Sequence, residues 1–176
     1  LPTIDAGPSQ TVCADMNSVT MAGFSYTGAS GAVWSGGTGS WSGNSYTPTA
    51  GEKTSGSVEL TYTTTGASPC ADINDKMTVT FKPVPTVNAG PDQSVCADMN
   101  SVTMAGFSYT GASGATWSGG SGSWSGNSYS PTAGEKTSGS VALTYTTTGA
   151  DPCADISDRM VVTFLALPTA NAGTAM

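Results

Sequence analysis

Ser57–Thr65 reads Ser-Val-Glu-Leu-Thr-Tyr-Thr-Thr-Thr, and this stretch decides the fold class. Val58, Leu60 and Tyr62 fall on one face of an extended strand, and threonines fall on the other face. Lys76–Lys82 alternates in the same way, and no segment of the chain has a sustained helical period. Alternation without a helical period predicts an all-β protein.

Shorter strands are predicted on the N-terminal side of this stretch. They cover Gln10–Cys13, Ser18–Tyr26, Ala32–Ser35, Ser40–Ser42 and Ser45–Thr49. Gly36–Gly39 is a turn, so the two segments that flank it are predicted to form a hairpin. Ala50–Gly56 is predicted to be a polar turn or a single helical turn. About seven short strands are typical of an immunoglobulin-like Greek-key β-sandwich, with Trp34 packed between the sheets.

The whole pattern repeats with a period of 83 residues. Residues 2–84 and 85–167 differ at only 15 of 83 positions, and residue 168 begins the pattern again. The sequence therefore predicts an immunoglobulin-like repeat over 1–84, a second over 85–167, and the start of a third over 168–176. We expect the chain to be a slice of a longer array. Its short, partly apolar junctions favour contact between neighbouring repeats, and hence a semi-rigid rod.

Composition and charge exclude several classes of function. The net charge of −7 repels phosphate backbones, so no nucleic-acid partner is expected. The chain has no run of about 18 or more apolar residues, so no membrane insertion is expected. It has no His to act as a general base, and Glu59 of the first repeat is replaced by Ala142 in the second. We therefore expect no enzyme activity and no catalytic residues.

The cysteines indicate the compartment. Each repeat has two cysteines 57 residues apart, Cys13 with Cys70 and Cys96 with Cys153. A zinc site needs Cys or His in close pairs, which this chain lacks. The sequence predicts the disulfides Cys13–Cys70 and Cys96–Cys153, each stabilising its repeat by about 4 kcal/mol; buried free thiols are the alternative. Disulfides predict an extracellular, secreted location.

Four motifs occur in the same order in both repeats. In the first repeat they are Pro-Thr-x-x-Ala-Gly-Pro-x-Gln-x-Val-Cys (2–13), Trp-Ser-Gly-Gly-x-Gly-Ser-Trp (34–41), Tyr-x-Pro-Thr-Ala-Gly-Glu (46–52) and Leu-Thr-Tyr-Thr-Thr-Thr-Gly-Ala-x-Pro-Cys (60–70). The ordered set resembles the PKD-like, immunoglobulin-like repeats of giant Bacteroidota surface adhesins of the gliding-motility type. The resemblance implies stalk or filament material at the cell surface, exported by type IX secretion. Its implied partners are neighbouring repeats and other copies in a fibre.

Acidic residues follow both cysteines of each repeat and are candidate Ca²⁺ ligands. If Cys13 binds Cys70, Asp15 and Asp72 come close together. Carboxylate and amide oxygens on loops suit Ca²⁺, which is the one candidate cofactor. The alternative is that these side chains cap tight turns by accepting hydrogen bonds from backbone N–H groups. The full candidate set is Asp15, Asn17, Asp72 and Asp75 in the first repeat, and Asp98, Asn100, Asp155 and Asp158 in the second.

Two tryptophans are candidate glycan contacts. Trp41 and its equivalent Trp124 can offer a flat face to sugar rings, or they can pack in the core instead. A surface polysaccharide is therefore a candidate partner. The predicted function is a structural stalk or filament repeat of an extracellular adhesin. The alternative is a ligand-binding module that binds Ca²⁺ or carbohydrate.

Overall fold

The structure is a computed structural model that describes residues 1–170 and residue 173. Two compact units divide the chain: Leu1–Val84 with Asp151–Cys153 (unit 1), and Pro85–Ala150 with Ala154–Met176 (unit 2). The described residues between 168 and 176 form no helix or strand. The rest of this predicted start of a third repeat, 171–172 and 174–176, lies outside the described residues.

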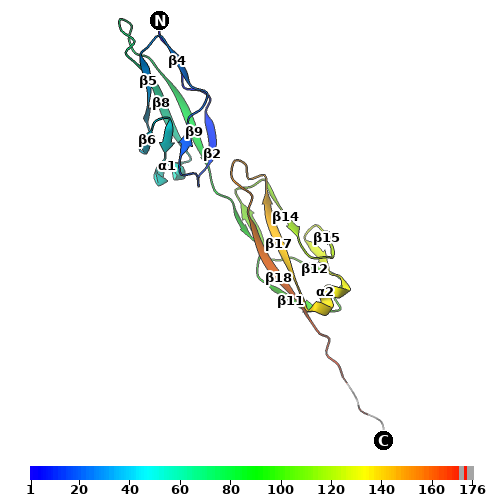
Figure 1. The fold of residues 1–176 in the computed structure, drawn as a ribbon. Coiled ribbons are helices and arrows are strands. Elements are labelled where there is room, and N and C mark those ends of the chain that lie inside the picture. Colours follow the sequence, from blue (N-terminus) through cyan, green and yellow to red (C-terminus); the bar gives the residue numbers. More distant parts are fainter. Residues whose placement is uncertain (171–172, 174–176) are drawn as a thin grey trace. The chain divides into compact units, whose positions relative to one another are not determined.

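Unit 1 is a sandwich of two main sheets (Figure 1). Its strands and helix are β1 (Thr3–Asp5), β2 (Gln10–Cys13), β3 (Val19–Thr20), β4 (Ser25–Thr27), β5 (Gly31–Gly36), β6 (Ser40–Ser42), β7 (Ser45–Thr47), α1 (Ala50–Ser55), β8 (Ser57–Thr65) and β9 (Asn74–Lys82). One sheet has the order β2-β9-β8-β5, in which β2 runs parallel to β9 and the other pairs are antiparallel. The other sheet has the order β3-β7-β6, and β1 pairs separately with β4.

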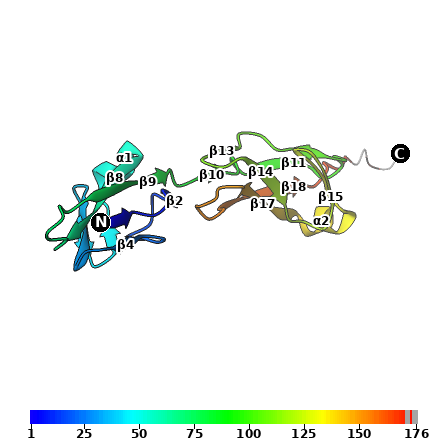
Figure 2. The same cartoon turned by 90° about the horizontal axis from the view of Figure 1, so that it is seen from above.

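Unit 2 repeats this architecture (Figure 2). Its elements are β10 (Thr86–Asn88), β11 (Gln93–Cys96), β12 (Val102–Thr103), β13 (Ser108–Thr110), β14 (Gly114–Ser118), β15 (Ser123–Ser125), β16 (Ser128–Ser130), α2 (Ala133–Ser138), β17 (Ser140–Thr148) and β18 (Ser157–Leu165). The sheet orders are β11-β18-β17-β14 and β12-β16-β15, and β10 pairs with β13. The all-β sandwich predicted from the alternating pattern is therefore confirmed.

The core follows the predicted alternation. In unit 1 both sheets supply buried side chains, and Trp34 is only 9% exposed, as expected of a residue packed between sheets. β8 and β9 bury the predicted faces, Val58, Leu60 and Tyr62 together with Met77, Val79 and Phe81. Burial of apolar surface on this scale is the dominant favourable term in folding. The equivalent strands of unit 2 bury the equivalent residues.

Two predicted strand features are wrong. Ser18–Tyr26 is not one strand: it splits into β3 and β4, because Gly23 between them has a positive φ of 74° that a strand does not accept. The predicted hairpin across Gly36–Gly39 is also absent. β5 pairs with β8 and β6 pairs with β7, so the chain crosses from one sheet to the other at this turn. The glycines allow the crossing, since Gly36 and Gly37 have φ values of 91° and 69°.

The predicted helical turn at 50–56 is the six-residue helix α1. Thr49 caps its N-terminus: the Thr49 side chain accepts a hydrogen bond from the Glu52 backbone N–H, and the Glu52 side chain accepts one from the Thr49 backbone N–H. Gly56 ends the helix in the left-handed conformation, with a φ of 86°. This Thr-x-x-Glu capping box with a C-terminal Gly explains why so short a helix forms. α2 has the same caps.

Candidate functional site

The register of β2 against β9 separates the two cysteines of the first repeat. Cys13 lies opposite Lys82, at the end of β9, whereas Cys70 precedes Asn74, where β9 begins. A strand of this length spans about 26 Å at roughly 3.3 Å per residue, whereas a disulfide joins Cα atoms about 4.4–6.8 Å apart. The predicted Cys13–Cys70 disulfide is therefore wrong. The predicted Cys96–Cys153 bond is wrong for the same reason, since Cys96 lies opposite Leu165 at the end of β18.

Cys13 instead forms a disulfide with Cys153, 140 residues later in the chain. Their Cα atoms are 4.8 Å apart, and the segment Asp151–Cys153 belongs to unit 1. Lys82 Nζ donates a 2.9 Å hydrogen bond to the Asp151 carbonyl oxygen. Cys153 Sγ lies 3.6 Å from the Pro83 carbonyl oxygen. The disulfide and these contacts thus join the segment Asp151–Cys153 to the C-terminal ends of β2 and β9.

The other two cysteines are free thiols. Cys13 and Cys153 are 4% and 8% exposed, while Cys70 and Cys96 are both exposed and unbonded. Each free thiol is the repeat equivalent of a bonded one, since Cys96 follows Cys13 by 83 residues and Cys70 precedes Cys153 by 83. At each of these two repeat positions, the cysteine that forms the disulfide is buried and the free one is exposed.

The candidate Ca²⁺ ligands of the first repeat lie at opposite ends of β9. Asp15 and Asn17 follow Cys13, whereas Asp72 lies in the loop before β9 and Asp75 is in its first residues. Asp72 Oδ1 accepts a 3.1 Å hydrogen bond from the Ala67 backbone N–H. The premise that a disulfide brings Asp15 next to Asp72 is therefore wrong.

Asp75 accepts a hydrogen bond from a distant strand. Its Oδ2 lies 2.9 Å from the Ala6 backbone nitrogen, which donates. This bond, with a further one from the Lys76 backbone N–H, lowers the pKa of Asp75 from its ordinary value. The carboxylate thus has a structural role that needs no metal, because it ties the chain after β1 to β9.

The candidate ligands of the second repeat also accept hydrogen bonds from the protein or lie apart from one another. Asp155 Oδ1 accepts hydrogen bonds of 3.2 Å from both the Ala150 backbone N–H and the Thr147 hydroxyl. Asp158 Oδ2 accepts one of 2.9 Å from the Ala89 backbone N–H, and this bond lowers its pKa. Asp98 and Asn100 follow Cys96, so they lie at the other end of β18. Across residues 1–170 and 173, no three Cys, Asp or Glu side chains gather closely enough to hold a metal ion. Binding of Ca²⁺ stays a prediction without a preformed cluster.

Trp41 and Trp124 take part in ring stacks. Trp41 stacks on Trp34 with ring centroids 5.6 Å apart, and Trp34 stacks in turn on Tyr62 at 4.6 Å. Trp41 Nε1 donates a 3.2 Å hydrogen bond to the Gly36 carbonyl oxygen. Trp124 stacks on Trp117 at the same 5.6 Å. Packing explains both tryptophans, and glycan contact by them stays a prediction.

Glu52 is a buried carboxylate in the segment 50–56, which was predicted to be a polar turn or a single helical turn. It is 9% exposed and accepts four hydrogen bonds. Oε1 accepts from the Thr38 backbone N–H and the Tyr46 hydroxyl, each at 2.7 Å. Oε2 accepts from the backbone N–H and the hydroxyl of Thr49, at 2.8 and 3.1 Å. The spacing Thr49-x-x-Glu52 is the signal in the sequence that predicts such a site.

These hydrogen bonds control the ionisation of Glu52. Burial alone raises the pKa of a carboxyl group, because it disfavours the charged form. The donors on Thr38, Tyr46 and Thr49 outweigh burial and lower the pKa of Glu52 from 4.5 to about 2. Glu135 accepts the equivalent hydrogen bonds in the second repeat, from Ser121, Tyr129 and Thr132, and its pKa is also lowered to about 2. Both carboxylates are therefore charged at neutral pH, and each accepts four hydrogen bonds from protein groups.

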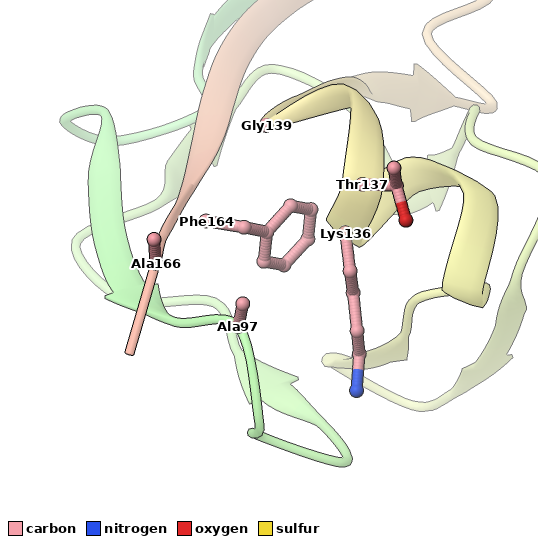
Figure 3. A pocket seen from close by; sticks show the side chains of 6 residues that line it. All are labelled: Ala97, Lys136, Thr137, Gly139, Phe164 and Ala166. Atoms are coloured by element: carbon pink, nitrogen blue, oxygen red, sulfur yellow. The ribbon is translucent and has the colours of Figure 1, made fainter. Parts of the chain in front are cut away.

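One pocket lies in unit 2, and Ala97, the residue after Cys96, is part of its lining (Figure 3). Phe164 forms its floor, while Lys136 and Thr137 of α2 form one wall. Ala97, which follows Cys96, and Ala166, which follows β18, form the opposite side. The pocket therefore lies at the ends of β11 and β18 in unit 2. The equivalent ends of β2 and β9 in unit 1 lie beside the disulfide.

No helix in the described part of the chain is long and apolar enough to cross a membrane. No family model matches the chain, and no curated protein matches it.

Solved structures match the fold. Sidekick-1 immunoglobulin domains 1–5 match with 11% identity and a TM-score of 0.53, over 93% of this chain and 39% of that chain. Extracellular domains 3–5 of Drosophila OTK match with 10% identity and a TM-score of 0.52, over 94% of this chain and 62% of that chain. An I-band fragment of titin matches with 11% identity and a TM-score of 0.50, over 94% of this chain and 66% of that chain. The likeness shows tandem immunoglobulin-like sandwiches, and at these identities it shows the fold alone.

Proposed function

We propose that this chain is a structural repeat segment of an extracellular adhesin, in which a disulfide carries the tension past the modules of a spacer. The single observation that carries the proposal is the Cys13–Cys153 disulfide, which closes a loop across 140 residues. Disulfides persist in oxidising compartments, which supports an extracellular location. The Glu52 and Glu135 carboxylates are held as anions by protein hydrogen-bond donors, which suits a spacer better than an enzyme.

The disulfide determines the path of force through the chain. Tension on the two ends passes along residues 1–13, across the Cys13–Cys153 bond, and on from residue 153. Residues 14–152 are bypassed, because covalent bonds do not yield to forces that unfold domains. A spacer of this kind keeps its length under load even if the bypassed modules unfold.

We further propose that the chain comes from a giant Bacteroidota surface adhesin exported by type IX secretion. The support is the ordered set of four motifs, which occurs in both repeats. Neighbouring repeats of the same chain are then its first partners. The near identity of the repeats supports a uniform role for them.

Single-molecule stretching tests the spacer function. Pulled from its ends with the disulfide intact, the chain should extend only through residues outside the loop. Reduction should add about 460–500 Å of contour length, because 140 residues separate the cysteines and each residue spans roughly 3.3–3.6 Å. A Cys70→Ser/Cys96→Ser variant removes the free thiols and should behave like the parent. Equal extension before and after reduction would contradict the proposed force path.

A further inference from the structure

We propose that an array of these repeats is a disulfide ladder, in which the first cysteine of each repeat bonds to the second cysteine of the repeat that follows it. The bond between Cys13 of the first repeat and Cys153 of the second is one such link. The inference rests on the proposed function, because it concerns repeats that stand in an array. It names the partner that Cys96 takes there, which is the second cysteine of a following repeat.

The register of each main sheet excludes a disulfide within one repeat. Cys13 pairs with the last residue of β9, and Cys96 pairs with the last residue of β18. The second cysteine of each repeat, Cys70 or Cys153, precedes the start of the same long strand. About 26 Å of strand separates the two cysteines, at roughly 3.3 Å per residue. A disulfide of either cysteine therefore needs a cysteine of another repeat.

The path of the chain identifies that other repeat as the neighbour. β9 ends at Lys82, and only three residues separate it from β10. Ala89, which follows β10, donates its backbone N–H at 2.9 Å to Asp158 near the start of β18. β18 is the strand that follows the loop of Cys153. The chain thus leads from the strand end beside Cys13 to the loop that carries Cys153, and a following repeat of the same sequence continues this path from Cys96.

The backbone around the first cysteine has the same geometry in both repeats. In each, the residue after the cysteine donates its N–H to the last carbonyl of the long strand, and the residue three places after it donates to the cysteine carbonyl. These hydrogen bonds are Ala14 to Lys82 and Met16 to Cys13 in the first repeat, and Ala97 to Leu165 and Met99 to Cys96 in the second. Cys96 is therefore held as Cys13 is, although only Cys13 is bonded here.

The loop around the second cysteine is also the same in both repeats. An aspartate accepts hydrogen bonds from a backbone N–H and from a threonine hydroxyl, and a glycine turns the chain with a φ of 70°. These residues are Asp72, Ala67, Thr64 and Gly66 in the first repeat, and Asp155, Ala150, Thr147 and Gly149 in the second. Because both partners are ordered before they bond, joining them needs little further ordering.

The ladder gives an array a property that one bond does not give. The bond in this chain closes a loop over residues 13–153, and Cys96 lies inside this loop. The loop that begins at Cys96 therefore opens before the previous loop closes. Every backbone bond in the interior of an array then lies within at least one loop. A single break of the backbone leaves such an array in one piece, which protects a spacer under tension.

The chemistry requires an oxidant, which is a small-molecule disulfide such as oxidised glutathione. The thiolate of Cys96 attacks one sulfur of oxidised glutathione, which releases one glutathione thiolate and leaves a mixed disulfide on Cys96. The thiolate of the second cysteine of the following repeat then attacks the Cys96 sulfur and releases the second glutathione thiolate. Two protein thiols are oxidised to one disulfide, and one glutathione disulfide is reduced to two thiols. The protons that the protein thiols lose pass to the released glutathione.

The chain as it stands tests whether bonds within a repeat are excluded. Cys13→Ser leaves Cys153 without its partner. With oxidised glutathione, Cys153 and Cys96 of this variant should each carry glutathione, which mass spectrometry of the unreduced tryptic peptides detects. A disulfide between Cys96 and Cys153 of one molecule would overturn the proposal.

A chain extended by one repeat tests the ladder itself. A further copy of residues 85–167 is joined after Leu167, and a site for a sequence-specific protease is placed at the new junction. This junction lies outside the loop 13–153 and inside the loop that begins at Cys96. After oxidation and cleavage, the extended chain should give one band on a non-reducing gel and two bands after reduction. Two bands without reduction would overturn the proposal.

Cys96→Ser in the extended chain is the matched control. It removes only the proposed link, so the cleaved control should give two bands without reduction. A single band from the control would mean that another cysteine makes the link, and it would also overturn the proposal.

Stretching of the two-repeat chain distinguishes this proposal from the proposed function. A gain of length on reduction, together with an extended chain that separates after cleavage, contradicts the ladder alone. The absence of any gain contradicts the proposed force path, whatever the extended chain does.

Discussion

The Tyr46 hydroxyl donates a 2.7 Å hydrogen bond to Glu52 Oε1 inside unit 1. Tyr46 is fully buried in β7, and Glu52 is on α1, so the bond ties the three-stranded sheet to the helix that follows it. Tyr129 and Glu135 repeat the pair in unit 2 at the same distance. Each unit therefore has one carboxylate that accepts its hydrogen bonds from protein donors, and in unit 1 this carboxylate is buried.

Glu52→Gln should destabilise unit 1 by about 2 kcal/mol, because a neutral amide replaces the charged acceptor of four hydrogen bonds and turns an N–H donor toward existing donors. Denaturant unfolding followed by Trp fluorescence measures the change. Glu59→Ala is the matched control. Glu59 forms only an exposed ion pair with Lys76, and the second repeat already has Ala142, so the control should change stability by less than about 0.5 kcal/mol. Equal effects of the two variants would contradict the structural role of Glu52.

Acid should unfold both units through these carboxyl groups. The pKa of Glu52 and of Glu135 is about 2 in the folded chain, against an ordinary value of 4.5. A lowered folded pKa gives stability that is complete above pH 4.5 and is lost as the pH falls towards 2. A plot of melting temperature against pH should therefore fall in this window.

The double variant Glu52→Gln/Glu135→Gln is the control for the acid effect. Its melting temperature should start lower at neutral pH and should fall less steeply in acid. Some slope should remain, because the pKa values of Asp75 and Asp158 are also lowered. A slope as steep as that of the parent chain would mean that other groups cause the acid sensitivity.

Gly37→Ala should destabilise unit 1 more than Gly43→Ala does. Both glycines have positive φ, 69° and 58°, so both variants carry the backbone strain of a left-handed alanine. A Cβ at Gly37 clashes with the Tyr46 hydroxyl, whereas a Cβ at Gly43 meets nothing within 4 Å. We expect about 1 kcal/mol for Gly43→Ala and about 2 kcal/mol or more beyond that for Gly37→Ala. Similar unfolding free energies for the two variants would argue against close packing around Tyr46.

Trp41→Ala should weaken the fold of unit 1 by about 2–3 kcal/mol, because the indole ring stacks on Trp34 and its N–H donates to Gly36. Thermal unfolding measures the effect. Tyr26→Ala is the control, since Tyr26 is 39% exposed and its ring lies farther from its neighbour, at 6.3 Å from Tyr62. If Trp41→Ala left the chain as stable as the parent, the Trp41 ring would not be needed for packing and would be free for glycan contact.

Residue alternation was enough to predict the long strands and their buried faces. The predicted bounds of Ser57–Thr65 are those of β8, and Val58, Leu60 and Tyr62 are buried as expected. Strand pairing was harder to predict. The Gly36–Gly39 turn is as compatible with a crossing between sheets as with a hairpin, and local sequence does not distinguish them.

The disulfide was mispredicted for a physical reason. Spacing along the sequence shows that Cys13 and Cys70 are the two cysteines of one repeat. It does not show which end of β9 each of them lies beside. The parallel pairing of β2 with β9 puts Cys13 beside Lys82, far from the loop that holds Cys70. Glu52 was predictable from Thr49-x-x-Glu52, yet its burial depends on Thr38 and Tyr46, which reach it only in the folded sandwich.

The most direct test of the account is disulfide mapping of the oxidised chain. Free thiols are alkylated in acid, and the chain is then digested with trypsin without reduction and analysed by mass spectrometry. Trypsin does not cleave at Lys82 before Pro83, so the cysteines fall on four peptides, 1–53, 54–76, 77–136 and 137–159. Peptide 1–53 should be linked to 137–159, and Cys70 and Cys96 should be alkylated. Peptide 1–53 linked to 54–76, with 77–136 linked to 137–159, would contradict this pairing.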